Sequence, residues 1–554
     1  MPSHLARARR PAGDLASPAI DRAPDVLAAY LDDAAHYPGG HAEGVARPRS
    51  EAEVAGLVGS ASRVLAVGAQ SSVTGGATPD GGLVLSTERL TAIHEAGQDH
   101  VRAGAGVPLE TLQKLLRDRR RWYAPVPTFT GACVGGVAAT NAAGAATFKY
   151  GTTRAWVDGL TVVLACGCVL DLERGATPAD ERDGWRLDCA CGTRAFRPGT
   201  YRMPAVPKCS AGYFAAPGMD LIDLFVGSEG TLGVITDVTL RTLPLDRVTA
   251  LAAVFATAEA EALGLVRELR DASHRTWRTG DPAGIDVAAV ESLDRRCLDV
   301  LDEDGMHARC GVAVPDGTAM LLLIQLELPA GTTAERAFDQ AAASLDAGAA
   351  DSPIGRLARL LDARGWLDRT ELVVPGDERR TAQLLAYREG APAGVNRRVG
   401  DAKREVDPRI DKTAADMIVP FDRFGDMLAV YRDGFGRRGL DCAIWGHISD
   451  GNVHPNLIPT SWEDVLAARA AILDFGREAT RLGGSPLAEH GVGRSAIKQS
   501  LLSLLYGDQG IEEMRAIKRA LDPDWKLAPG VILRADGPPV PGRGGVQPAW
   551  SGAG

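Results

Sequence analysis

The sequence predicts a protein of mixed α and β structure, in the α+β class, with two to four domains. Its 554 residues, 45% of them hydrophobic, suffice for several sizeable cores. Short apolar runs of strand length and a segment with helical features stand in the N-terminal half, and a hairpin pattern stands in the C-terminal half. Many of the 64 glycines cluster in the loops that separate these elements.

Charge and composition exclude several classes of protein. The balance of 61 basic and 71 acidic residues gives a net charge of −10, so we expect no nucleic-acid partner. Nine cysteines in a chain of this length do not form a secreted disulfide framework. Apolar runs such as residues 320–324 are far too short for a transmembrane segment, and the basic N-terminus lacks the apolar centre of a signal peptide. We therefore expect a cytoplasmic protein; peripheral membrane association and assembly as a homodimer stay open.

Two segments at the ends of the chain have little to bury. We expect residues 1–23 to form a disordered N-terminal arm and residues 535–554 to form a disordered tail. Between them, the first element is a helix over residues 48–57, with Ser50 as its N-cap and Glu53 completing a capping box.

A glycine-rich loop, Gly68-Ala-Gln-Ser-Ser-Val-Thr-Gly-Gly-Ala77, lies between two short strands, residues 64–67 and 83–86. Small and hydroxylated residues after a strand let backbone N–H groups converge on an anion, and a pyrophosphate would fit there. The alternative is a simple turn, which is what many glycine-rich loops are.

Two further runs of small residues follow, over 127–144 and 226–236, the second leading into a strand over 234–240. The first offers almost no side-chain volume for a core, so it is expected to pack against something flat or extended. The chain contains neither a complete GxGxxG fingerprint after a strand nor a GxxxxGK[ST] loop, which disfavours a Rossmann nucleotide fold and a P-loop.

The most informative stretch is Trp445-Gly-His-Ile-Ser-Asp-Gly-Asn-Val-His454, with Glu489-His490 further along the chain. Asp450-Gly451 is a tight-turn dipeptide, so the stretch predicts a hairpin that places His447 and His454 about 5 Å apart at Cβ. Two imidazoles and a carboxylate suit Zn²⁺ or a similar divalent ion and leave coordination positions open. The alternative is a plain hairpin with hydrogen-bonded histidines.

Paired cysteines occur as Cys166-Gly-Cys168 and Cys189-Ala-Cys191, with Cys209 nearby. Four thiols could bind zinc, but the usual structural spacing is CxxC, so reduced thiols without a metal are the favoured interpretation. No cysteine-rich iron–sulfur signature is present near the C-terminus.

The motifs together resemble the vanillyl-alcohol oxidase/p-cresol methylhydroxylase superfamily, in its D-lactate and D-2-hydroxyacid dehydrogenase branch. The resemblance is carried in order by the runs at 68–77, 134–144, 148–154, 227–235, 446–454, 489–493 and 527–530. It implies a two-subdomain FAD-binding domain of the p-cresol methylhydroxylase type over residues 24–245, followed by an α+β cap domain over 246–534.

The resemblance also implies the flavin contacts. They would come from Gly68, Ala69, Gln70, Ser71, Ser72, Pro127, Thr128, Gly131, Cys133, Gly135, Gly136, Asn141, Gly144, Gly230 and Ile235. The chain departs from the family pattern in two places: the usual Arg-Gly-Gly-Gly is Val67-Gly-Ala-Gln70 here, and Cys133 replaces a common threonine. The first loop lacks the histidine of covalent members, so we expect non-covalent FAD.

For the chemistry, the resemblance implies a divalent metal, Zn²⁺ by preference, on His447, His454 and Glu489. His490 would be the general base for the substrate hydroxyl. Arg388 and Lys412 would bind the substrate carboxylate, and Asn452 would reach the substrate from the hairpin. A hydroxyl residue that some relatives carry four positions after the arginine is Pro392 here, so the substrate need not be lactate.

The predicted function is oxidation of a D-2-hydroxy acid, of the lactate, glycolate or 2-hydroxyglutarate kind, to its 2-oxo acid. Reduced flavin would pass its electrons to a separate acceptor or to oxygen. Two alternatives stay open: a flavin-dependent transferase like alkyldihydroxyacetone-phosphate synthase, and a flavin-binding subunit without turnover.

Overall fold

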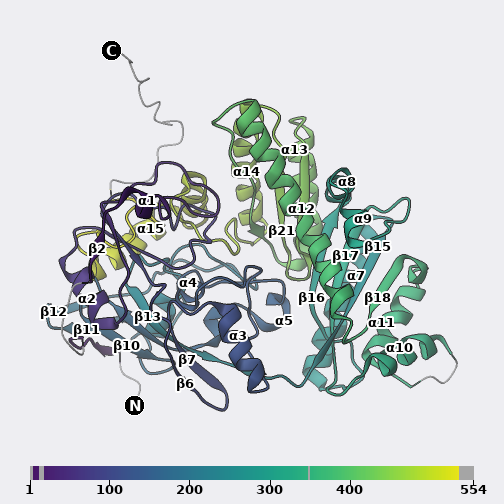
Figure 1. The fold of residues 1–554 in the computed structure, drawn as a ribbon, viewed down its shortest axis with the longest axis horizontal. Helices are drawn as coiled ribbons and strands as arrows, with labels where there is room; N and C mark the ends of the chain where they lie inside the picture. Colours follow the sequence, from purple (N-terminus) through teal and green to yellow (C-terminus); the bar gives the residue numbers. More distant parts are fainter. Residues whose placement is uncertain (1–3, 12–17, 347–349, 536–554) are drawn as a thin grey trace.

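A computed structural model describes residues 4–11, 18–346 and 350–535 of the chain, and it shows two lobes, each built on β-sheet (Figure 1). Helices and strands are mixed throughout, which confirms the predicted α+β class. The predicted tail lies outside the described residues from 536 onward. None of the described helices is both long enough and apolar enough to cross a bilayer.

The first lobe opens with a four-stranded sheet in the order β2-β3-β5-β4, in which β5 pairs in parallel with both of its neighbours. The predicted strands at 64–67 and 83–86 are β4 and β5. Helix α2 starts where predicted, because the Ser50 side chain accepts the N–H of Glu53. The capping box is different from the prediction: Glu53 accepts the N–H of Arg49, one residue before the cap. The bounds are α1 Pro24–Ala28, α2 Glu51–Ser60, β2 Ile20–Asp21, β3 Gly44–Ala46, β4 Val64–Val67 and β5 Leu83–Ser86.

A five-stranded antiparallel sheet, in the order β10-β9-β13-β7-β6, forms the second part of this lobe. Beside it lie a three-stranded sheet, β1-β11-β12, and the pair β14-β8. The bounds are β1 Leu5–Arg7, β6 Ile93–Ala96, β7 His100–Gly104, α3 Leu109–Asp118, β8 Arg121–Trp122, α4 Val134–Ala139, α5 Thr147–Tyr150, β9 Val157–Val163, β10 Val169–Glu173, β11 Trp185–Cys189, β12 Gly192–Phe196, α6 Leu221–Phe225, β13 Val234–Arg241 and β14 Leu243–Pro244. Strand β1 belongs to the segment for which the sequence predicts a disordered arm, and it pairs in parallel with β11.

The second lobe is built on a seven-stranded antiparallel sheet in the order β18-β15-β17-β16-β20-β21-β19. The bounds are β15 Val248–Ala256, α7 Glu259–Thr279, β16 Val287–Asp294, α8 Arg295–Glu303, α9 Met306–Cys310, β17 Met320–Leu328, α10 Ala334–Ala342, α11 Pro353–Asp362, β18 Thr370–Val373, α12 Glu378–Glu405, β19 Met417–Ile418, α13 Phe424–Gly436, β20 Cys442–His447, β21 Asn452–Leu457 and α14 Trp462–Arg481. Strands β16 and β17 are buried along nearly their whole length, as expected for strands at the centre of a covered sheet.

The chain then returns to the first lobe. Helix α15, Ala496–Leu521, contacts β12 of the first lobe, where Arg194 donates to the carbonyl groups of Ala520 and Leu521 at 3.2 and 2.8 Å. The backbone of Val64 on β4 exchanges hydrogen bonds with Lys526 and Ala528, of 2.8 and 2.7 Å. The first lobe is therefore made from both ends of the described chain, and the second lobe is inserted between them.

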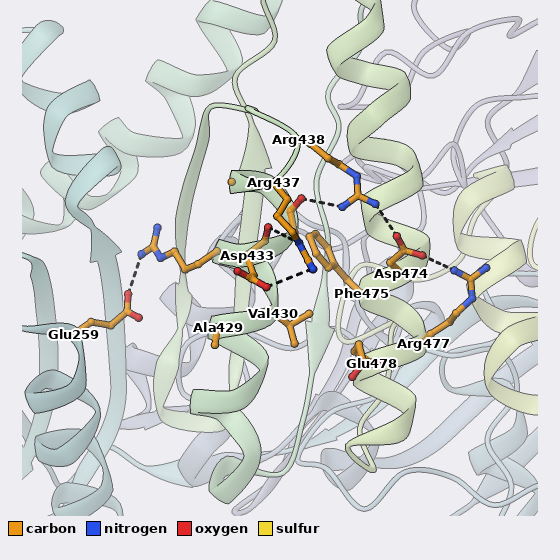
Figure 2. Close-up of a pocket in the computed structure, with 13 residues that line it drawn as sticks. Glu259, Ala429, Val430, Asp433, Arg437, Arg438, Asp474, Phe475, Arg477 and Glu478 are labelled. Carbon is orange, nitrogen blue, oxygen red and sulfur yellow. Dashed lines mark hydrogen bonds and ion pairs between the residues drawn. The ribbon is translucent and has the colours of Figure 1, made fainter.

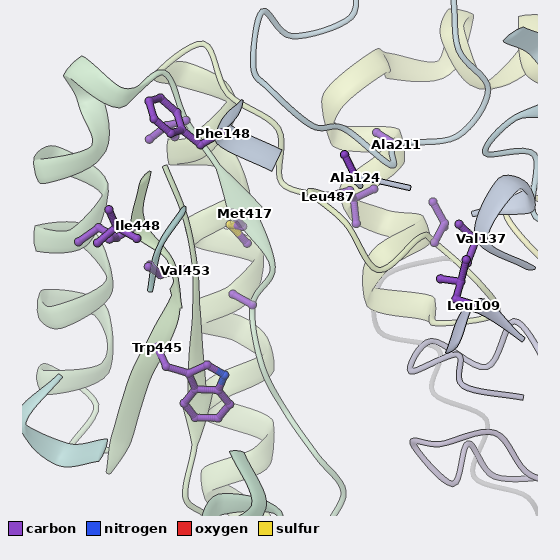
Figure 3. Packing of buried hydrophobic residues seen from close by; sticks show 14 of the residues in the cluster. Leu109, Ala124, Val137, Phe148, Ala211, Met417, Trp445, Ile448, Val453 and Leu487 are labelled. Atoms are coloured by element: carbon purple, nitrogen blue, oxygen red, sulfur yellow. The ribbon is translucent and has the colours of Figure 1, made fainter. Parts of the chain in front are cut away.

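The two lobes meet over a packed surface. Phe148 on α5 lies among the buried side chains of the second lobe, whereas Leu487 lies near Ala124 and Ala211 of the first (Figure 3). Beside Phe148, Lys149 forms ion pairs of 2.6 and 2.7 Å with Asp286 and Glu327. Side chains from each lobe are thus buried in the other, which fixes the lobes relative to each other.

Candidate functional site

The predicted hairpin is present as β20 and β21. Its turn contains Gly451 with φ +85°, the left-handed region that an Asp-Gly turn supplies readily. The register pairs His447 with Asn452 and Trp445 with His454, so His447 and His454 are diagonal neighbours on one face rather than directly opposite. Their ring centroids are 5.8 Å apart.

Glu489 joins the two histidines from the loop between α14 and α15. Its Oε1 lies 3.4 Å from Nε2 of His447, 3.1 Å from Nε2 of His454 and 3.5 Å from Nε2 of His490. Three imidazoles therefore converge on one carboxylate oxygen. The side chains of His447 and His454 are buried, but that of His490 is 38% exposed, which makes it the imidazole of the three that a substrate can reach.

Asp416 is a member of the site that the sequence analysis did not find. Its Oδ2 lies 2.9 Å from Nδ1 of His490 and accepts the backbone N–H groups of Glu489 and His490 at 3.2 and 3.0 Å. Burial alone would raise the pKa of Asp416, but His490 and Lys498 outweigh it and hold the pKa well below its usual range. Asp416 is thus a carboxylate that fixes the ring of His490. No spacing in the sequence pointed to it, because the contact depends on the pairing of β19 with β21.

Lys208 is the second member that was missed. It is 2% exposed, and its Nζ lies 2.5 Å from Oε2 of Glu489 and 3.2 Å from Oδ2 of Asp450. Burial would lower the pKa of Lys208, but the two carboxylates outweigh burial and raise it. The same ammonium, with His447, holds the pKa of Glu489 well below normal although burial opposes this. Lys208 directly follows Pro207, a context that gives no sequence signal of a charged partner, and only the fold shows which carboxylates it contacts.

Arg388 is connected to the histidine site through Glu291. Its Nε and Nη2 donate to Oε2 of Glu291 at 2.8 and 2.5 Å, and Nη1 donates to Glu389 at 2.7 Å. Oε1 of Glu291 contacts Nδ1 of His447. Burial would lower the pKa of His447, yet the Glu291 carboxylate outweighs it and raises the pKa to about 9. The structure therefore joins Arg388 to His447 through Glu291, a residue that the sequence analysis did not include.

The other two predicted residues differ in their surroundings. Asn452 is fully buried, and its amide donates to the carbonyl of Met417 at 2.9 Å. Lys412 keeps an exposed side chain, and within the described ranges it makes no hydrogen bond or ion pair that would neutralise it. Desolvation by the surrounding protein nevertheless lowers the pKa of Lys412 to about 8. The Lys412 ammonium is thus accessible but partly desolvated and has no counter-ion among the described residues. A carboxylate that bound there would supply the missing negative charge.

These side chains can hold a divalent cation. The ligand atoms of Asp416, His454, Glu489 and His490 lie within 4.8 Å of one another, and Nε2 of His447 reaches the same Glu489 oxygen. Among the described residues, two buried polar atoms of the hairpin have no hydrogen-bond partner: Oδ1 of Asn452, and Nδ1 of His454, which lies 3.6 Å from Oδ1 of Asp416. Imidazole and carboxylate donors suit Zn²⁺ and neighbouring divalent ions, so the donor types fit a divalent metal. Of the three predicted ligands, the group within 4.8 Å contains His454 and Glu489, with Asp416 and His490 in place of His447.

The first lobe forms hydrogen bonds with the loop that carries Glu489 and His490. The carboxylate of Glu229 accepts the N–H groups of Val492 and Gly493 at 2.7 and 2.8 Å, and Ser210 accepts that of Gly491 at 3.1 Å. The carbonyl of Thr74 accepts the N–H of Arg494 at 2.9 Å. Thr74 belongs to the glycine-rich loop 68–77, so the segment that carries the histidine site lies beside that loop, at the junction of the lobes.

The loops predicted to hold the flavin adjoin each other. A Cβ on Gly68 would stand 3.2 Å from Cβ of Cys133, which leaves little room for a larger residue. Gln70 has φ +52°, so the loop contains the left-handed turn that points successive N–H groups to one side. Gly135 packs on Ala105, whereas Gly136 is exposed and a Cβ there would meet no atom within 4 Å. The backbone at Gly136 is therefore open on the side of α4 that does not pack on Ala105. A ligand could approach the backbone closely there.

The remaining predicted flavin residues line the same part of the first lobe. Asn141, at φ +48°, accepts the N–H of Arg154 through its side chain at 2.8 Å, and Gly230, at φ +71°, has open space around its Cα. Ala69, Ser71 and Ser72 belong to the glycine-rich loop 68–77. The other residues lie just before α4, just after it or on β13, and they are Pro127, Thr128, Gly131, Gly144 and Ile235.

A broad hollow of about 1360 Å³ lies elsewhere, on the second lobe between α13 and α14 (Figure 2). Its charged side chains pair with one another: Arg438 and Arg477 both contact Asp474, at 2.7 and 2.6 Å, and Arg432 contacts Glu259 at 2.9 Å. Because these charges are already satisfied, the hollow carries no signal of a ligand.

Comparisons with known proteins agree with this arrangement. Residues 42–173 match the family described as FAD binding domain, and residues 257–532 match FAD linked oxidases, C-terminal domain. The chain is 28% identical over 499 residues to a D-lactate dehydrogenase of Archaeoglobus fulgidus, covering 88% of this chain and 91% of the relative. It is 28% identical over 519 residues to a D-2-hydroxyglutarate dehydrogenase of Xanthomonas citri pv. viticola, covering 90% of each, and 26% identical to the glycolate oxidase subunit GlcD of Bacillus subtilis, covering 85% of this chain and 83% of that one.

Among solved structures, an alkyldihydroxyacetonephosphate synthase superposes with a TM-score of 0.54 at 14% identity, covering 92% of this chain and 82% of that one. At that identity the likeness concerns the fold alone.

Proposed function

The chain belongs to the FAD-linked oxidases, and from this premise we propose that it oxidises a D-2-hydroxy acid to the corresponding 2-oxo acid. One observation supports the proposal above all others: three imidazoles converge on Glu489 at a lobe junction that adjoins the glycine-rich flavin loops. Relatives named for oxidation of lactate, 2-hydroxyglutarate and glycolate support the substrate class.

His490 is the proposed general base. Its Nδ1 faces Asp416 at 2.9 Å, so the proton of the neutral ring is held on Nδ1 and Nε2 keeps a free lone pair. Nε2 is then the atom that takes the proton of the substrate hydroxyl. A base positioned in this way contributes about 10²–10⁴-fold to the rate.

His447, His454 and Glu489 are the proposed ligands of a divalent cation. When bound, such a cation lowers the pKa of a coordinated hydroxyl, and FAD, when bound, accepts the hydride. Two of the proposed ligands have further partners that fix their orientation. Glu291 contacts Nδ1 of His447, and Lys208 contacts Glu489. Ligand rings and carboxylates fixed by a second layer of hydrogen bonds keep their orientation through turnover.

Lys412 is the proposed site for the substrate carboxylate, since its ammonium is accessible and has no partner among the described residues. All three guanidinium nitrogens of Arg388 contact Glu291 or Glu389, so we propose that Arg388 positions Glu291 against His447. Direct contact of Arg388 with the substrate, and of Asn452 with the substrate, stays a prediction.

The test is anaerobic mixing of the flavin-loaded protein with a panel of D- and L-2-hydroxy acids. We expect D-2-hydroxy acids to bleach the blue absorption band of the flavin and their L-enantiomers to leave it intact. His490→Ala should keep the flavin yet slow this bleaching about 10²–10⁴-fold, whereas His41→Ala, a change at an exposed histidine in the first lobe, should behave as the parent protein. A panel without any bleaching would contradict the proposed activity, and unchanged rates in His490→Ala would remove the base.

A further inference from the structure

Four cysteines lie together far from the histidine site. The Sγ atoms of Cys166, Cys168, Cys189 and Cys191 are all within 4.8 Å of one another. Cys168 is buried, Cys166 and Cys189 are half-buried, and Cys191 is exposed. The sequence alone argued against a metal here, because paired CxC is not the usual spacing of a structural zinc site.

Two hairpin turns bring the four sulfur atoms together. Cys166 and Cys168 flank Gly167 in the turn between β9 and β10, where Gly167 has φ +78°. Cys189 and Cys191 flank Ala190 in the turn between β11 and β12.

The N-terminal strand holds the two turns side by side. Strand β1 pairs with β11 in the register Leu5 to Arg186 and Arg7 to Asp188, next to Cys189. Two residues later, Arg9 exchanges backbone hydrogen bonds of 2.8 and 2.9 Å with Val169, next to Cys168. The chain from Leu5 to Arg9 therefore spans both cysteine-bearing hairpins, and their meeting is a consequence of the fold.

We propose that these four cysteines bind one Zn²⁺ as a tetrahedral structural site. With Zn–S bonds of about 2.3 Å, the sulfur atoms of such a site stand roughly 3.8 Å apart, so the observed spacing needs only a small contraction. Binding takes up the four sulfurs as thiolates and releases their protons to solvent.

Mutual proximity favours a metal over disulfides. A disulfide requires two sulfurs in pairwise contact, at about 2.05 Å, and all nine cysteines are free thiols in the structure. A single cation at the centre of four ligands requires every sulfur to lie close to the three others, and the four cysteines meet this requirement. The ion would fasten the β11–β12 hairpin, and with it β1, to the five-stranded sheet of the flavin lobe.

The first experiment measures metal in the flavin-loaded protein after gel filtration in metal-free buffer. A structural tetrathiolate site binds zinc tightly, so we expect about one tightly held zinc per chain to remain, in addition to any metal on the histidine site. Protein produced with Co²⁺ in place of Zn²⁺ should show the intense ligand-field bands of a tetrathiolate site, in the red where oxidised flavin does not absorb. Both measurements use the unmutated chain and do not depend on the stability of a variant.

Variants separate this site from the histidine site. Cys168→Ser with Cys189→Ser should abolish this tightly held zinc and the cobalt bands, whereas Cys310→Ala, at a buried thiol on α9, should keep both. His454→Ala should keep the thiolate bands, because it removes a ligand of the other site only. The proposal is overturned if the unmutated protein retains no zinc and shows no thiolate–cobalt bands, or if mass spectrometry finds the four cysteines joined as disulfides.

Discussion

Replacing Lys208 by methionine tests the electrostatics of the site most directly. The side chains of Lys208, Glu489 and Asp450 are 1%, 7% and 0% exposed, so the lysine offsets two carboxylates with almost no help from water. Removing one partner of a buried ion pair typically costs about 3–5 kcal/mol, since the other charge is left unpaired. Burial already raises the pKa of Asp450, so this carboxyl takes up a proton more readily than Glu489. Protonation of Asp450 would remove one of the two unpaired charges, so we expect the loss in free energy of unfolding to lie near the lower end of that range.

A bound cation should restore much of this loss. Glu489 shares its charge between Lys208 and the proposed metal, so removal of the lysine should tighten metal binding while it destabilises the metal-free protein. A ligand at one hundred times its Kd contributes about 2.7 kcal/mol of stability. In domains of 150–250 residues one kcal/mol corresponds to about 2–4 °C, so the metal-free variant should unfold at least roughly 6 °C earlier.

The assay is thermal unfolding of metal-free and Zn²⁺-saturated protein, with the gain in Tm on metal addition as the readout. Lys518→Met is the matched control, because Lys518 is also buried and contacts Asp522 at 2.6 Å, away from the histidines. Both variants should lose stability, but only Lys208→Met should gain more from Zn²⁺ than the parent protein. An equal gain in all three proteins would refute the idea that Lys208 and the metal share Glu489.

Three further predictions concern the ligands, the flavin and the substrate. Glu291→Gln should weaken metal binding about 10–100-fold in a chelator competition, because His447 loses the carboxylate that orients its ring; Glu371→Gln, whose partner is Arg380, should not. Gly136→Val should lower flavin retention on gel filtration yet leave the Tm of the flavin-free protein unchanged, since the new side chain would occupy open space; normal flavin content would place the cofactor elsewhere. With a pKa of about 8, the Lys412 ammonium is lost as pH rises, so the KM for the acid should increase above pH 8 in the parent protein but stay flat in Lys412→Arg; identical profiles would remove Lys412 from substrate binding.

Local chemistry made part of this molecule predictable. The Asp-Gly turn fixes the β20–β21 hairpin, and the Ser50 cap fixes the start of α2, because both depend on residues within a few positions of each other. Lys208 and Glu489 are separated by 281 residues, and Arg388 and Glu291 by 97, so their pairing follows only from how the lobes and strands assemble. The four cysteines illustrate the same limit: their spacing argued against a metal, and the meeting of two hairpins argues for one.

The path of the chain explains why the site needs both lobes. Residues 482–495 join α14, in the second lobe, to α15, which packs on the first, so His490 is carried on a connection between them. His447 and His454 belong to the sheet of the second lobe, whereas Glu229, Ser210 and Thr74 of the first lobe hold the backbone of residues 491–494. A shift of one lobe against the other would therefore move His490 relative to the two buried histidines. Contacts such as that of Lys149 with Asp286 and Glu327 oppose this shift, and so hold the proposed base and the proposed ligands in place relative to the loops that we predict to bind the flavin.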